Sequence, residues 1–254
     1  MNGGLTYSTI CKGMNDRPLY PSLRQNLVGA WYPMLGCTGN TIPDLSNNRL
    51  TATGSSVLWN TQGIAFASSG GRCSLPLWDV PDSMTIAVTF TQASVIDVNR
   101  ILFCKDATDA KGIFLGYTAD VANGSAQRLS FRANKTQPVF LPSSLDSVWT
   151  NGKPHTIHVT YLAGAVTMYL DRVLAAAGTT AYPIQKPTSY PYNIGNDPNR
   201  NNGWLGTIHS VAIFSGVVPP FSDPLAPLRR RDDFEDETDL DSMIPMPLLT
   251  RGSL

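Results

Sequence analysis

Two alternating runs of residues around a short glycine-containing segment constrain the fold of this chain more than any other feature. Apolar and polar side chains alternate from residue 157 to 161, and again from 166 to 170, where Asp171 ends the pattern. Alternation with a period of two is typical of β-strands. Gly164 lies in the four residues between the runs, as a tight turn requires. Residues 153–171 are therefore predicted to form a β-hairpin.

Segments of the same character recur along the chain at intervals of roughly ten residues. The strongest is SMTIAVTFTQ at residues 83–92, in which Met84, Ile86, Val88 and Phe90 share one face. Further strands are predicted at residues 27–31, 50–53, 63–67, 72–75, 100–105, 112–117, 128–132, 139–141, 192–195 and 206–214. No stretch reads as a convincing amphipathic helix. This pattern predicts an all-β fold, an antiparallel two-sheet sandwich or jelly roll.

Composition divides the chain into a body and two arms. Residues 1–26 have no sustained periodicity, and residues 217–254 begin with a proline-rich stretch that leads into a charged run. Glu occurs only at positions 235 and 237, so the first 234 residues contain none. We predict an N-terminal arm at residues 1–26, a jelly-roll domain at 27–216, and a connector with a charged C-terminal arm at 217–254.

Charge and cysteine usage exclude several classes of protein. A net charge of zero, with 15% charged residues, argues against nucleic-acid binding through general electrostatics. The scattered Cys11, Cys37, Cys73 and Cys104 form no C-x-x-C pair, so no zinc site is predicted. We favour free, mostly buried thiols in a reducing compartment, with disulfides as the alternative. Residues 1–26 lack the apolar core of a signal peptide, and no apolar run approaches the ~20 residues of a membrane span.

Five segments of the predicted body carry a family pattern. They are LVGAW at 27–31, DLSNN at 44–48, SMTIAVTF at 83–90, HTIHVTY at 155–161 with YLD at 169–171, and IGND at 194–197 with GTIHSVAIF at 206–214. In this order they resemble the laminin-G-like, concanavalin-A-like jelly rolls, whose hairpin is written W-H-H-V-A-V-T-Y…Y-V-D-G. The resemblance covers about residues 27–216 and implies that Trp31 and Trp204 pack inside. Pro154, Arg172 and His209 depart from the pattern, which has Trp, Gly and often an acid at these positions, and Arg172 leaves the turn after Asp171 in question.

The residues that catalysis would need are missing from the body. Glycosidases of this fold use paired carboxylates, typically Glu, on one strand. The body has no Glu, and no predicted strand carries two Asp spaced by two or four residues. There is no G-x-S-x-G motif, and His155 and His158 lie three apart on a strand, so they face opposite sides. We predict no catalytic residues, no enzymatic activity and no required cofactor.

Two loops rich in side-chain oxygens are candidates for calcium. Ca²⁺ takes six to eight oxygen ligands, whereas turns favour Asn and Asp for their own local hydrogen bonds, and we favour the second interpretation. The candidate ligands are Asp44, Asn47 and Asn48 in one loop, and Asp197, Asn199, Asn201 and Asn202 in the other. For stacking on a sugar, Tyr190 and Tyr192 on either side of Pro191 are the candidate exposed aromatics.

The expected function is that of a non-enzymatic structural or binding component of a bacteriophage virion, as a head decoration, spike, fibre or tail part. Such a protein is made in the host cytoplasm and needs no signal peptide. Its arms would dock to other virion proteins, and its jelly roll would form homo-oligomers and face host-surface glycans. The predicted docking residues are Arg229, Arg230, Arg231, Asp232, Asp233, Glu235 and Asp236. The alternatives are a solvated charge run for the C-terminal arm, and a soluble calcium-dependent carbohydrate-binding lectin for the function.

Overall fold

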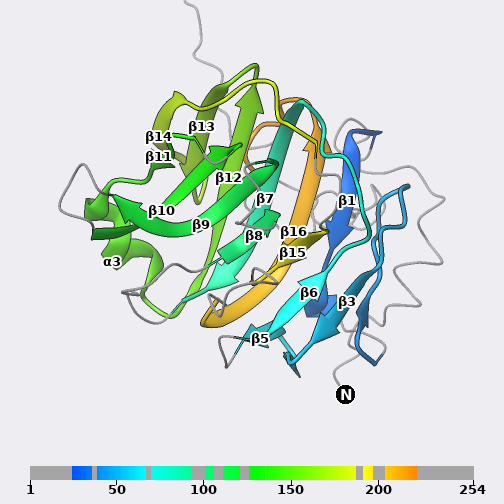
Figure 1. The fold of residues 1–254 in the computed structure, drawn as a ribbon. Helices are drawn as coiled ribbons and strands as arrows, with labels where there is room; N and C mark the ends of the chain where they lie inside the picture. The colour runs from blue at the N-terminus through cyan, green and yellow to red at the C-terminus, as the bar shows by residue number, and fades with distance from the viewer. Residues whose placement is uncertain are drawn as a thin grey trace, which may run out of the picture.

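Two antiparallel β-sheets packed face to face make up the computed structural model of the chain (Figure 1). The structure describes residues 25–35, 39–66, 70–92, 101–105, 111–120, 126–134, 136–186, 191–196 and 204–221. The all-β, two-sheet sandwich predicted from the sequence is confirmed. Strands β8, β9 and β10 of one sheet cross in front of β7 and β12 of the other in Figure 1.

The first sheet has the strand order β14-β13-β12-β7-β16-β5-β4, with β1 paired to β16 beside this path. Its strands are β1 (Leu27–Trp31), β4 (Leu58–Asn60), β5 (Gly63–Phe66), β7 (Ser83–Thr91), β12 (Pro154–Leu162), β13 (Ala165–Leu170), β14 (Val173–Thr179) and β16 (Gly206–Ser215). β7, β12 and β16 are its three longest strands and lie side by side at its centre.

The second sheet has the order β11-β10-β9-β8-β15-β6-β3-β2. Its strands are β2 (Thr41–Ile42), β3 (Ala52–Ser55), β6 (Arg72–Ser74), β8 (Ile101–Lys105), β9 (Ile113–Asp120), β10 (Ala126–Ala133), β11 (Val139–Phe140) and β15 (Tyr192–Ile194). Helical turns are short: η1 (Pro33–Leu35), η3 (Ser143–Leu145) and α3 (Asp146–Trp149). Within the described residues no helix is long and apolar enough to cross a membrane.

The predicted hairpin is confirmed as β12 and β13. Its register pairs Ile157 with Leu170 and Leu162 with Ala165. Only Ala163 and Gly164 lie between the paired ends, and both have positive φ, 48° and 88°. Positive φ at both central residues identifies a two-residue type I′ turn, whose twist matches that of the strands.

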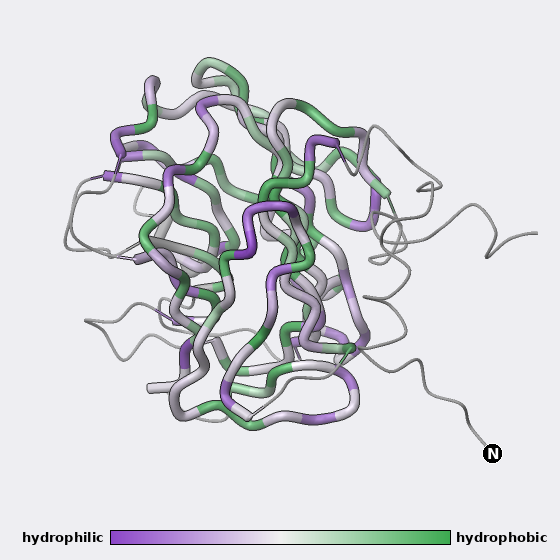
Figure 2. Tube along the Cα trace, turned by 90° about the vertical axis from the view of Figure 1, so that its right-hand side faces the viewer, coloured by the Kyte–Doolittle hydropathy of each residue, from purple (hydrophilic) through white to green (hydrophobic). Residues whose placement is uncertain are grey.

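The core lies between the sheets and follows the alternation along the strands. Ile86, Val88, Ile157 and Val159 point inward and are fully buried. Trp31 and Trp204 are also fully buried, as the resemblance implied. Figure 2 shows how hydrophobic and hydrophilic residues interchange along the same chain segments, which is the pattern expected of strands with one face in a core.

A second, smaller apolar cluster covers the outer face of the first sheet, which is the face turned away from the second sheet. It consists of Leu27, Ala30, Tyr32, Leu45, Ala87, Ala212, Phe214 and Val218, with Met34, Leu35 and Phe221 packed against it. Residues 216–221, called here the covering segment, supply part of it from the chain that follows β16. The first sheet is therefore covered by apolar groups on both faces.

The strand boundaries differ from the predicted ones by up to three residues, and three strands were missed. β2 and β4 are only two and three residues long. β14 has the sequence VLAAAGT and no buried position, so it has no alternation to detect. The division into two arms and a body stays a prediction, because residues 1–24 and 222–254 lie outside the described residues.

Candidate functional site

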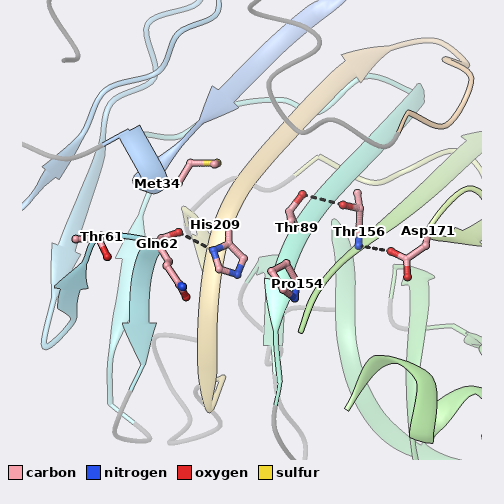
Figure 3. A pocket seen from close by; sticks show the side chains of 8 residues that line it. All are labelled: Met34, Thr61, Gln62, Thr89, Pro154, Thr156, Asp171 and His209. Carbon is pink, nitrogen blue, oxygen red and sulfur yellow. Dashed lines mark hydrogen bonds between the residues drawn. The ribbon is translucent and has the colours of Figure 1, made fainter. Parts of the chain in front are cut away.

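A pocket of about 390 Å³ lies on the outer face of the first sheet, beside the smaller apolar cluster (Figure 3). Six separate segments contribute to it: η1, the β4–β5 turn, β7, β12, the β13–β14 turn and β16. The lining residues are Met34, Thr61, Gln62, Thr89, Pro154, Thr156, Asp171 and His209. No local stretch of sequence carries this set, since only the register of the strands brings it together.

His209 reaches this face through a β-bulge. The register between β16 and β7 shifts between Ile208 and Ser210, so that no residue of β7 stands opposite His209 in the strand pairing. The bulge changes the phase of the strand, so that Ile208 before it and Val211 after it both enter the main core. The neighbouring backbone fits closely, because a Cβ at Gly63 would lie 2.3 Å from the carbonyl oxygen of Ile208.

The imidazole of His209 is held by two hydrogen bonds and is neutral. Its Nδ1–H donates to the carbonyl oxygen of Gln62 over 2.6 Å, and its Nε2 accepts from the Thr91 hydroxyl over 2.7 Å. Burial lowers the pKa of His209, partly offset by the hydrogen bond to Gln62. The ring is thus a fixed, uncharged part of the pocket wall.

Two threonine hydroxyls form the floor between the central strands. Thr89 and Thr156 are directly opposite each other in the β7–β12 ladder. Their Oγ1 atoms are 3.0 Å apart, so one hydroxyl donates to the other. The Thr156 N–H donates to the carboxylate of Asp171 over 2.8 Å, as Figure 3 shows.

Asp171 is the one carboxylate among the described residues that line the pocket. It begins a two-residue turn in which Asp171 and Arg172 both have positive φ, 49° and 72°. Its second oxygen lies 2.6 Å from Nδ1 of His155, and 43% of its side chain stays exposed. The turn that Arg172 put in question is therefore formed, and it leaves the carboxylate accessible from solvent.

The described lining of the pocket combines several hydrogen-bonding groups with one carboxylate. Hydroxyl, amide and carboxylate groups line it, so hydrogen-bond donors and acceptors are both present. Cleavage by the usual mechanism needs two carboxyl groups across the bond, and one carboxylate cannot supply both roles.

Asp44, a predicted calcium ligand, is buried, and its carboxylate accepts four hydrogen bonds that hold its loop against β1. One carboxylate oxygen accepts from the N–H groups of Ala30 and Ser46, and the other from the Ser46 hydroxyl and the Leu50 N–H, each over 2.8 Å. Asn48 donates from Nδ2 to the carbonyl oxygen of Val28 over 2.7 Å, and Asn47 is exposed. Among the described residues no three His, Cys, Asp or Glu side chains are grouped to hold a metal, and calcium binding at this loop stays a prediction.

The prediction of an exposed Tyr192 is wrong. Its side chain is fully buried, because β15 lies inside the second sheet between β6 and β8 and directs Tyr192 into the core. There the ring stacks on Phe103 with centroids 5.4 Å apart and planes 7° apart. Asp197, Asn199, Asn201, Asn202, Tyr190 and the charged residues 229–236 lie outside the described residues.

The two histidines of the hairpin, His155 and His158, both make contacts within the protein. His155 is bonded to Asp171 and Asn151, whereas His158 is fully buried on the outer face beneath Phe221. Cys73 is fully buried. That His209 and the threonine pair belong to one site was not predicted from the sequence. The one available signal was the change of phase within GTIHSVAIF, where apolar positions 208 and 211 are an odd number of residues apart.

Comparison with known proteins agrees with this architecture. The family model described as the concanavalin A-like lectin/glucanases superfamily matches residues 61–220. A comparison with curated proteins found no match.

Solved structures share the fold at low sequence identity. Domain 4 of AbnA, a GH43 extracellular arabinanase from Geobacillus stearothermophilus in complex with arabinotriose, is similar with a TM-score of 0.53 and 14% identity, over 80% of this chain and 96% of that domain. The botulinum neurotoxin serotype D binding domain has a TM-score of 0.56 and 13% identity, over 78% of this chain and 50% of its own. Trypanosoma rangeli sialidase has a TM-score of 0.55 and 14% identity, over 89% of this chain and 37% of its own.

Proposed function

Because the chain belongs to the concanavalin A-like lectin/glucanases superfamily, we propose that it is a non-enzymatic carbohydrate-binding domain. One observation carries the proposal: the outer face of this lectin-type sandwich has a pocket whose described lining residues are hydrogen-bonding groups with one carboxylate among them. The volume of about 390 Å³ lies within the range of small-molecule sites and is sufficient for one or two sugar residues.

The absence of Glu supports binding without hydrolysis. Residues 1–234, which include the whole of the family match, contain no Glu. Two of the similar structures come from enzymes, an arabinanase and a sialidase, but identities of 14% carry only the fold to this chain. A glycosidase of the usual type needs a pair of carboxyl groups, and the described lining of the pocket supplies only Asp171.

The proposal is tested by presenting the full-length chain to a glycan array that includes arabinotriose and sialylated oligosaccharides. We expect saturable binding with dissociation constants in the micromolar to millimolar range, as for a small polar site. Incubation of any bound glycan with the protein should release no shorter sugars. Release of sugar would contradict the non-enzymatic part, and failure to bind any glycan would contradict the binding part.

Repeating the array in EDTA tests calcium dependence, the alternative expected for the loops at residues 44–48 and 197–202. A calcium-dependent lectin would be supported if EDTA abolishes glycan binding and the Asp197→Ala variant also fails to bind. Binding that persists in EDTA would contradict it, and the pocket would then act without a metal.

The setting we propose is a bacteriophage virion, in which the terminal arms attach the chain to other virion proteins and the jelly roll, as a homo-oligomer, faces the host surface. The support comes from the sequence alone: the arms differ in composition from the body, and residues 229–231 are basic while acids dominate 232–241. Deleting residues 229–254 should abolish incorporation into particles. Incorporation at normal occupancy would rule out the C-terminal docking role without affecting the glycan proposal.

A further inference from the structure

We propose that the pocket on the outer face of β7, β12 and β16 holds a neutral sugar residue and rejects acidic sugars. This inference rests on the carbohydrate-binding function proposed above and specifies its site and its ligand class. It concerns the part of the pocket between His209 on one side and Asp171 on the other (Figure 3).

The charge of the pocket sets the ligand class. Asp171 is the one ionised group among the described lining residues, which include no Lys or Arg. One of its carboxylate oxygens already lies 2.6 Å from Nδ1 of His155. His209 is neutral because burial lowers its pKa. A sugar carboxylate would therefore meet the Asp171 carboxylate without a Lys or Arg among the described lining residues to pair with it, which is unfavourable in a partly desolvated site.

The polar groups suit the hydroxyls of a sugar ring. The Thr89 and Thr156 hydroxyls are 3.0 Å apart, a spacing close to that between neighbouring hydroxyls on a sugar. Because one donates to the other, the pair retains one proton and several lone pairs for a ligand. On the opposite wall, the exposed Gln62 amide and Thr61 hydroxyl supply a further donor and acceptor.

Apolar groups complete the walls. The Pro154 ring and the Met34 side chain line the pocket beside these hydroxyls, and can cover the C–H face of a sugar ring in place of an aromatic residue. A mixture of apolar walls and a few positioned polar groups is typical of small-ligand sites.

The site is rigid before any ligand arrives. Thr89, Thr156 and His209 are on the three central strands, and each is held by a hydrogen bond within the protein. Groups that are already ordered lose little conformational entropy on binding. The selectivity should therefore follow from fixed positions, rather than from a loop that adapts to many ligands.

The test uses the full-length chain on an array of neutral, sialylated and uronate-containing oligosaccharides. Thr156→Val removes one floor hydroxyl while keeping the shape of the side chain. We expect it to weaken binding to neutral glycans about five- to tenfold, which corresponds to one lost hydrogen bond. Thr160→Val is the matched control, because Thr160 is on the same face of β12 and does not line the pocket; its binding should equal that of the unmodified chain.

A second variant tests the charge argument. Asp171→Asn removes the carboxylate charge at a turn position whose positive φ Asn tolerates, and should admit acidic glycans that the unmodified chain rejects. Amide chemical-shift changes on titration with a bound glycan provide a measurement that needs no variant, and should centre on Gln62 and Thr156.

The outcomes separate the two proposals. Strong binding of acidic glycans by the unmodified chain, or equal binding by Thr156→Val and Thr160→Val, overturns the neutral-sugar pocket but leaves carbohydrate binding intact. Shift changes centred away from Gln62 and Thr156 likewise place the ligand elsewhere. Binding of no glycan contradicts both proposals.

Discussion

Asp44 ties the first strand to the loop that follows it. Its carboxylate accepts three backbone N–H groups and one hydroxyl, including the N–H of Ala30 in β1. A buried acceptor of this kind can be removed only by leaving several donors without partners. The residue that the sequence suggested as a metal ligand is therefore already saturated by the chain itself.

Asp44→Ala should lower the free energy of unfolding by roughly 3 kcal/mol, because three backbone N–H groups lose their acceptor. Urea denaturation in EDTA measures this effect without any contribution from calcium. Asn47→Ala is the control, since Asn47 is exposed in the same loop, and should change stability by less than about 0.5 kcal/mol. A loss below 1 kcal/mol for Asp44→Ala would show that water replaces the carboxylate.

At the scale of elements, the two turns that flank β13 are both of the type with two positive φ values. Ala163 and Gly164 form one, and Asp171 and Arg172 the other. Gly and Asn adopt this conformation readily, whereas Ala and Arg pay a steric cost there. The hairpin strands evidently stabilise the turns enough to hold unfavourable residues in them.

Ala163→Asn should raise the free energy of unfolding by about 0.5–1 kcal/mol, because Asn-Gly is the preferred pair for this turn. Ala163→Val at the same exposed position should do the opposite, since a β-branched residue fits positive φ poorly. Thermal unfolding of the two variants beside the unmodified chain is the measurement. Equal melting temperatures would mean that the turn is not held at positive φ in solution.

Elements with a strong local pattern were the ones that the sequence could predict. Apolar and polar residues alternate along the whole of β7 and over residues 157–161 and 166–170 of the hairpin, and the apolar residues of these runs do point into the main core. β14 was missed because it has no buried position. Tyr192 was misplaced because a three-residue strand gives too short a pattern to show which face is buried. The pocket could not be predicted for a different reason. Its residues are brought together only by the strand order and by the bulge at His209, and both of these depend on contacts between segments that are distant in the sequence.

At the scale of the whole molecule, the covering segment packs over part of the outer face of the first sheet, beside the pocket. Gly216 donates its N–H to Ser83, Val218 donates to the hydroxyl of Thr85, and Phe221 donates to Nε2 of His158 over 3.2 Å. The Phe221 ring lies edge-on to His158, with centroids 4.6 Å apart. His158 must be neutral to accept this bond, and burial lowers its pKa from 6.5 to about 4 despite the nearby Asp171.

This arrangement makes stability depend on acid pH. The unfolded chain binds a proton at His158 near pH 6.5, but the folded chain does so only near pH 4. Stability is therefore full above pH 6.5 and falls between pH 6.5 and 4, by up to roughly 3 kcal/mol. Urea denaturation across this range measures the slope. His158→Gln keeps an acceptor for the Phe221 N–H but does not titrate, so the free energy of unfolding of this variant should change less between pH 6.5 and 4. If the pH dependence of the variant equals that of the unmodified chain, groups other than His158 cause it.

The pairing of β1 with β16 has a consequence for how the chain reaches this structure. Trp31 lies opposite Val211, so the sheet joins segments from nearly opposite ends of the described chain. While the protein is being synthesised, β1 and one edge of β7 must wait until β16 has emerged from the ribosome. Closing so long a loop is slow, and unpaired edges attract other chains in the meantime. The hairpin of β12 and β13 can form early beside β7, so that only one edge of β7 remains unpaired until β16 is made.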